Sequence, residues 1–82
     1  MAKARVYVTL KKSVFDPQGK AVHEALLSLG YGQVADVRQG KFFEIDLQGL
    51  SGEPARQVAE EVARKVLANP VIEGWRVEVE GS

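Results

Sequence analysis

Hydrophobic residues alternate with more polar ones in several short segments of the chain and recur at helical spacing in two others. Val6, Val8 and Leu10 alternate with their neighbours, a period of two that is typical of a strand with one buried face. The same alternation predicts strands over residues 41–47 and 75–80, and more weakly over residues 34–38. Apolar residues at helical spacing predict helices over residues 17–29 and 55–67.

Residues typical of helix ends and turns mark the boundaries of these elements. Asp16 suits the N-cap of the first helix and Pro17 its first position, while Gly30 ends it. Gln39-Gly40 indicates a hairpin turn between the second and third strands, and Asn69-Pro70 ends the second helix.

Gly19 is unusual inside a predicted helix, because glycine there costs about 1 kcal/mol relative to alanine. Either the first helical turn is flexible, or another group approaches the backbone closely at this position.

The predicted order is β-α-β-β-α-β, within one domain that spans residues 1–82. This order favours an α+β, ferredoxin-like fold, in which a four-stranded antiparallel sheet carries both helices on one face. The other face would be bare, and we expect a protein interface there rather than plain solvent exposure. Its residues would be Tyr7, Thr9, Phe42, Glu44, Arg76 and Glu78.

Length and composition narrow the class of protein. A chain of 82 residues has a thin core, which favours an oligomer or a subunit. The 11 basic and 11 acidic residues balance, which argues against a nucleic acid partner. With no cysteine, no secretory signal and no membrane-spanning run of apolar residues, we expect a cytoplasmic protein.

No group of residues in the sequence has the pattern of a catalytic site. His23 is the only histidine and has no cysteine or second histidine with which to hold a metal. Glu60 and Glu61 have cationic partners four residues later, as on a solvated helix face. Gly40-Lys41 could bind an anion, although a turn beside a solvated lysine is equally consistent with these residues. We therefore expect no catalytic, cofactor or metal site in this chain.

Three segments together resemble the PurS family, the small subunit of bacterial phosphoribosylformylglycinamidine synthase. They are Leu10-Lys11 followed by Asp16-Pro17-Gln18-Gly19, then Val37-Arg38-Gln39-Gly40-Lys41, then Ala68-Asn69-Pro70-Val71-Ile72-Glu73. The resemblance extends from about residue 5 to residue 80. The chain departs from the family pattern at Lys12-Ser13-Val14-Phe15, so the resemblance does not extend to the contacts of that loop.

The resemblance implies a subunit of an ATP-dependent, glutamine-using ligase of purine biosynthesis. Such a subunit has no active site, and it bridges a synthetase subunit and a glutamine amidotransferase subunit to support ammonia transfer. ATP and magnesium would serve the assembled enzyme without binding this chain, which would itself form a homodimer or a dimer of dimers. We expect the partner-binding residues in the matched segments: Asp16, Pro17, Gln18, Gly19, Arg38, Gly40, Lys41, Asn69 and Pro70.

Two other functions share the predicted order of elements. Lys41-Phe42-Phe43 lies where the stacking aromatic residues of an RNA-recognition domain would lie, but Glu44 and Asp46 follow on the open face and would repel phosphate. A small ligand-binding regulatory domain is the second alternative. Such domains usually accompany an enzyme in the same chain, which this sequence lacks.

Overall fold

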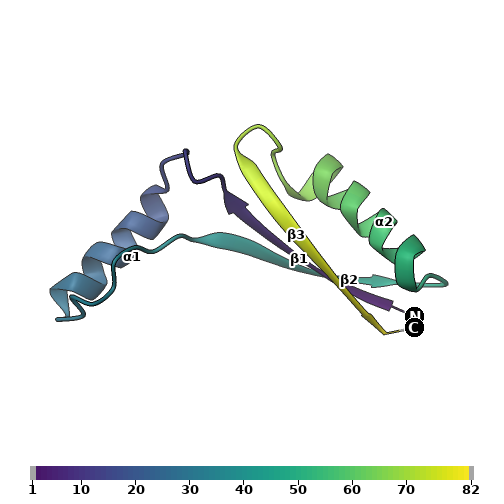
Figure 1. Cartoon of the computed structure of the whole chain (residues 1–82), viewed down its shortest axis with the longest axis horizontal. Helices are drawn as coiled ribbons and strands as arrows, with labels where there is room; N and C mark the ends of the chain where they lie inside the picture. The colour runs from purple at the N-terminus through teal and green to yellow at the C-terminus, as the bar shows by residue number, and fades with distance from the viewer. Residues whose placement is uncertain (1, 82) are drawn as a thin grey trace.

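The computed structural model describes residues 2–81 and contains three strands and two α-helices (Figure 1). In chain order they are β1 (Ala2–Leu10), α1 (Pro17–Ser28), β2 (Gly40–Leu47), α2 (Gly52–Val62), a π-helical turn (Ala63–Leu67) and β3 (Glu73–Gly81). Neither helix is long and apolar enough to cross a bilayer, within the part of the chain described.

The strands form one antiparallel sheet in the order β2-β1-β3. Val6 at the centre of β1 lies opposite Phe43 on β2 and Val77 on β3. Since side chains alternate between the two faces of a strand, all three belong to the same face. That face carries the core, as the alternation in the sequence predicted.

Helix α2 packs on the core face over β1 and β3. Three alanines spaced along one side of this helix and its π turn, Ala55, Ala59 and Ala63, are fully buried and allow the helix to lie close to the sheet. Val6 and Val8 are the largest fully buried side chains. Most of the buried core residues are alanines and valines, which agrees with the expectation of a thin core.

The four-stranded sheet was wrong for this chain, because residues 34–38 pair with no strand. A two-residue hairpin at Gln39-Gly40 would need positive φ angles there, yet neither residue is among those with positive φ. The chain instead continues straight from residue 39 into β2. Gly40 is needed because β1 lies close to its backbone. A Cβ at this position would collide with the Val8 carbonyl and the Thr9 side chain.

The expectation that both helices cover one face was also wrong. Only α2 lies on the sheet, while α1 and the segment that returns from it extend away from one end (Figure 1). Val22 and Leu27 on this helix and Leu29 at its C-cap are 42%, 45% and 73% exposed. The molecule is accordingly elongated, with extents of 49 × 26 × 14 Å.

The predicted ends of α1 are confirmed in detail. Asp16 is the N-cap and Pro17 the first helical residue. At the other end the Gly30 N–H donates to the Leu27 carbonyl and the Tyr31 N–H donates to the Leu26 carbonyl. With φ of +97° at Gly30, these bonds form a Schellman motif.

Candidate partner interface

The carboxylate of Asp16 connects the start of α1 to the start of β2. Its Oδ1 atom accepts a hydrogen bond from the Gly19 N–H at 2.9 Å, and its Oδ2 atom accepts one from the Gln39 N–H at 2.7 Å. The side chain is only 5% exposed. Since both bonds stabilise the ionised form, they lower the pKa of Asp16, and the bond from Gln39 contributes most.

Gly19 is needed because other parts of the chain approach its backbone closely. A Cβ at this position would collide with the Val37 carbonyl oxygen and with the Asp16 carboxylate. Of the two explanations that the sequence left open, close approach is therefore correct. The approaching group belongs to the chain itself.

Arg38 and Gln39 tie the returning segment to the loop that precedes α1. The Nη2 atom of Arg38 donates to the backbone carbonyls of Lys11 at 3.0 Å and Val14 at 2.9 Å. The side-chain amide of Gln39 donates to the Gln18 side-chain oxygen at 2.9 Å. Two of the three segments singled out in the sequence are thus joined, although 23 residues separate Asp16 from Gln39.

The third segment joins them through Lys41 and Lys11. The Lys41 ammonium donates to the Leu67 carbonyl at 3.2 Å and lies 3.4 Å from a Glu73 carboxylate oxygen. The Lys11 N–H donates to the Ile72 carbonyl at 2.8 Å. All three segments therefore meet where β1 ends and β2 and β3 begin, and we call this region the junction.

Asn69 shapes the turn between the π turn and β3. Its N–H donates to the Glu73 carboxylate at 2.7 Å, and its side-chain oxygen accepts from the Val71 N–H at 3.1 Å. The Ile72 and Glu73 N–H groups both donate to its carbonyl. This turn presents Pro70 to solvent.

The predicted partner-binding residues are thus brought together at the junction, where most of their polar side chains bond to the chain itself. The ammonium of Lys41 faces Leu67 and Glu73, which favours the interpretation as a structural lysine over an anion site. Contact of these residues with another subunit stays a prediction.

The bare face of the sheet carries the residues that the sequence assigned to it. Arg76 lies 4.2 Å over the ring of Tyr7, whose ring centroid lies 5.1 Å from that of Phe42. The Tyr7 hydroxyl donates to the Glu78 carboxylate at 3.0 Å, which raises the pKa of Tyr7 and lowers that of Glu78. Most charges on this face have a partner within it, as in the Arg5–Glu80 pair.

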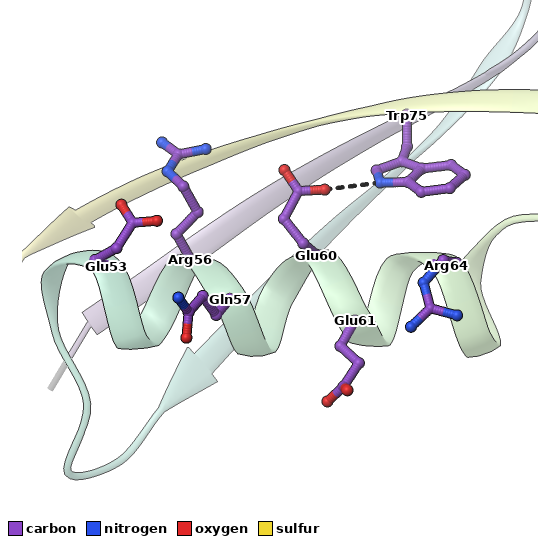
Figure 2. A pocket seen from close by; sticks show the side chains of 7 residues that line it. All are labelled: Glu53, Arg56, Gln57, Glu60, Glu61, Arg64 and Trp75. Atoms are coloured by element: carbon purple, nitrogen blue, oxygen red, sulfur yellow. Dashed lines mark hydrogen bonds between the residues drawn. The ribbon is translucent and has the colours of Figure 1, made fainter.

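A shallow groove of about 500 Å³ lies between the outer side of α2 and the edge strand β3 (Figure 2). Trp75 Nε1 donates to Glu60 at 3.0 Å across it. Arg56 donates to the Val77 carbonyl at 3.1 Å and so covers part of the open edge of β3. Glu60 was expected to pair with a cation four residues later and bonds instead to Trp75. The second expected pair on this helix, Glu61 with Lys65, forms at 3.4 Å.

The side chains that could ligate a metal ion lie apart from one another within residues 2–81. No three His, Cys, Asp or Glu side chains gather there in a way that could hold a metal ion. His23 Nε2 lies 2.7 Å from the Val34 carbonyl oxygen, so this nitrogen carries a proton and donates it. The histidine therefore fixes the returning segment against α1.

Exposed apolar residues beside Asn69 were missed by the sequence analysis. Val66 is one of the apolar residues that predicted the helix over residues 55–67, yet it is 76% exposed. Val71 in the neighbouring turn is 77% exposed. The Asn-Pro dipeptide could have indicated an exposed turn, but nothing in the periodicity indicated the change of direction at Val66.

Comparisons with known proteins converge on one family. The family model described as PurS, phosphoribosylformylglycinamidine (FGAM) synthase, matches residues 3–81. The chain is 49% identical over 80 residues to the synthase subunit PurS of Bacillus subtilis. This alignment covers 98% of this chain and 94% of that protein. Identity to the Methanocaldococcus jannaschii subunit is 39% over 80 residues, covering 98% and 96%.

Solved structures agree with these matches. The B. subtilis PurS structure has a TM-score of 0.86 and 47% identity, covering 99% of this chain and 100% of that chain. The M. jannaschii PurS structure, one of the subunits of formylglycinamide ribonucleotide amidotransferase, has a TM-score of 0.88 and 36% identity, covering 100% and 99%. A chain in the structure of PurLQS from Thermotoga maritima has a TM-score of 0.84 at 22% identity, covering 98% and 99%, which shows a shared fold.

Proposed function

The chain belongs to the PurS family and is a subunit of phosphoribosylformylglycinamidine synthase in purine biosynthesis, and from this premise we propose that it bridges the synthetase and the glutamine amidotransferase subunits. The observation that carries the proposal is the match of residues 3–81 to the family model. The RNA-binding and regulatory alternatives have no comparable support.

We propose that this subunit acts without catalytic residues of its own. The geometry of the junction supports this view, because its carboxylate, guanidinium and ammonium groups are engaged by backbone groups of the same chain. A catalytic acid, base or nucleophile needs a free atom within hydrogen-bond reach of a substrate. ATP and magnesium would accordingly bind to the larger subunits.

The elongated shape that helix α1 gives the molecule favours a second copy of the chain as its partner. The radius of gyration is 15.9 Å, against about 12 Å expected for a compact domain of this length. The accessible surface is 5588 Å², against about 4,900 Å² for a folded monomer of this mass. The excess of accessible surface is comparable to the roughly 800 Å² that each partner buries in an interface of standard size.

The sheet offers a place where such a helix would fit. Helix α2 packs over β1 and β3, which leaves Phe43 and Ile45 on the core face of β2 partly exposed. The outer side of α1 presents Val22, Ala25 and Leu29. We propose that α1 of one copy covers the β2 side of the other, so that a homodimer gains the two-helix layer that a single chain lacks.

Reconstitution of the enzyme tests the bridging role. Purified synthetase and amidotransferase subunits are assayed with and without this chain, fed either with glutamine or with free ammonia. Omission should abolish glutamine-dependent synthesis and leave most of the ammonia-dependent synthesis. Equal loss of both activities would show instead that the chain supports the synthetase itself.

A further inference from the structure

The outer edge of β2 has backbone groups that no other strand of residues 2–81 pairs. Strand β1 lies between β2 and β3, so each outer strand has one open edge. The Lys11 N–H donates to the Ile72 carbonyl, which shows that the odd-numbered residues of β1 face β3. Since successive residues of a strand direct their N–H and C=O groups to opposite edges, the register turns the groups of the even-numbered residues of β2 outward. These residues are Phe42, Glu44 and Asp46.

The edge of β3 is partly covered, whereas the edge of β2 is open. Arg56 donates to the outward carbonyl of Val77 at 3.1 Å, in the middle of β3. In the part of the chain that the structure describes, no side chain covers the outward carbonyls of β2 in this way. An open strand edge is a template for pairing with another strand. The edge of β2 is therefore the one available to a strand from outside the chain.

Residues 37 and 39, just before β2, direct their backbone groups toward the start of α1. The Val37 carbonyl oxygen lies so close to Gly19 that a Cβ there would collide with it. The Gln39 N–H donates to the Asp16 carboxylate at 2.7 Å. Both residues are odd-numbered, so the even-numbered residues beside them direct their groups the opposite way.

Asp36 and Arg38 accordingly present their N–H and C=O groups away from α1. Between residues 2 and 81, no backbone hydrogen bond outside the helices and strands engages these groups. The segment runs on into β2 without a reversal (Figure 1). The open groups before β2 and those along β2 therefore form one continuous edge over residues 36–46, which we call the open edge.

We propose that the open edge pairs antiparallel with the open edge of a second copy, so that residues 34–38 of each copy lie beside β2 of the other. A contact between identical segments needs a two-fold axis at their midpoint, which lies near Gly40. Val37 then lies opposite Phe43 or one of its neighbours on the core face, Lys41 and Ile45. This inference deepens the homodimer proposed above and rests on it, because α1 leads directly into the exchanged segment.

The apolar side chains of the exchanged segment suit this position. If the alternation of β2 continues through residues 34–38, Ala35 and Val37 lie on the core face of the sheet. Beside them in the other copy lie Phe43 and Ile45, which α2 leaves partly exposed. The pairing therefore removes apolar surface of both copies from water in addition to joining their backbones.

The charges along the open edge do not oppose the pairing. The exchanged segment brings one anion and one cation, Asp36 and Arg38, and so no net charge. The carboxylates of β2 that share the bare face already have cations within their own chain. Glu44 lies 3.7 Å from Arg5, and Asp46 is paired with a lysine of β1.

Cysteine pairs test the proposal directly, because the chain has no cysteine of its own. Val37→Cys is combined in turn with Lys41→Cys, Phe43→Cys and Ile45→Cys. At about 3.3 Å per residue, positions 37 and 41 of one extended chain lie roughly 13 Å apart, beyond the ~7 Å between Cα atoms that a disulfide spans. A disulfide in any of these variants must therefore join two copies. The matched control is Val37→Cys with Val79→Cys, on the core face of β3 at the far side of the sheet.

Under mild oxidation, at least one of the three pairs should form a covalent dimer about tenfold faster than the control pair or Val37→Cys alone. The fastest pair identifies the register. Asp36→Pro is an independent variant, because it removes an outward N–H that makes no backbone bond within the described residues. It should weaken the dimer at least tenfold in sedimentation, and Ala35→Pro, whose N–H points the other way, should weaken it less.

A chain that sediments as a dimer while none of the three pairs crosslinks faster than the control would overturn the pairing and leave the homodimer intact. Equal weakening by the two proline variants would overturn it as well. A mass of 9.0 kDa at all concentrations would refute the homodimer together with the pairing. All these measurements use this chain alone, so their outcome is separate from that of the bridging function, which the reconstituted enzyme tests.

Discussion

A few side chains at the junction define its geometry by bonding to distant backbone groups. Asp16 joins the N-terminus of α1 to the residue that precedes β2, and Arg38 holds two carbonyls of the loop before α1. These residues add almost no apolar area to the core. Their role is to set the direction in which α1 leaves the sheet.

Asp16→Asn tests this role through the dependence of stability on pH. The folded-state pKa of Asp16 lies below the value of 3.8 expected for the unfolded chain, so the unfolded state binds a proton more readily. The stability contributed by the ionised carboxylate is complete above the unfolded pKa and is lost as the pH falls through the lower, folded pKa.

The variant should melt about 4–8 °C lower at pH 7, because an amide has one oxygen and can accept only one of the two backbone hydrogen bonds that the carboxylate accepts. Its melting temperature should fall less steeply than that of the unsubstituted chain below about pH 4. Thermal unfolding between pH 7 and pH 2 measures both effects. Parallel curves for the two proteins would show that the carboxylate does not contribute through its charge.

At the level of elements, the two helices play different parts. Helix α2 packs on the sheet with three buried alanines on its side and its π turn, and it covers the core face over β1 and β3. Within residues 2–81, helix α1 is bonded to its own flanking segments, through Asp16 and Gln18 at its start and His23 along its length. Its remaining apolar side is left without a partner in a single chain.

Val22→Asp combined with Leu29→Asp should convert the proposed homodimer to a monomer. Both side chains lie on the outer side of α1, where charge would oppose docking on a second copy. Sedimentation equilibrium at micromolar concentration gives the mass, and Leu27→Asp, on another side of the same helix, should leave the dimer intact. A double variant that still sediments as a dimer would exclude α1 from the interface.

At the scale of the whole molecule, a thin core is combined with an elongated shape. A sheet of three strands with one helix, whose largest fully buried side chains are two valines, excludes little apolar surface from water. The arm formed by α1 adds surface that no part of the same chain covers. The stability of this protein is therefore expected to depend on assembly.

The melting temperature should rise with protein concentration, because a folded dimer unfolds to two chains and mass action favours the dimer at high concentration. Calorimetry over a hundredfold range of concentration, together with sedimentation, would measure this. A melting temperature independent of concentration, with a mass of 9.0 kDa, would contradict the proposed dimer.

Local chemistry in the sequence was enough to predict most elements and the segments that form the junction. The alternation in β1, β2 and β3 identified the core face, because that pattern follows directly from strand geometry. The ends of α1 followed from Asp16, Pro17 and Gly30, whose preferences depend only on the adjacent backbone. The order of the three matched segments was sufficient to indicate the family.

Tertiary structure decided what local preference leaves open. Residues 34–38 have a pattern compatible with a strand, but His23 bonds to Val34 and Asp16 to the neighbouring Gln39. Arg38 also bonds to the loop before α1, so the segment lies beside α1. Gly40 was predicted to be part of a hairpin turn, but glycine is needed there because the Val8 carbonyl lies close to its backbone. The position of α1 off the sheet and the exposure of Val66 depend on hydrogen bonds between residues whose pairing becomes visible only when the chain is folded.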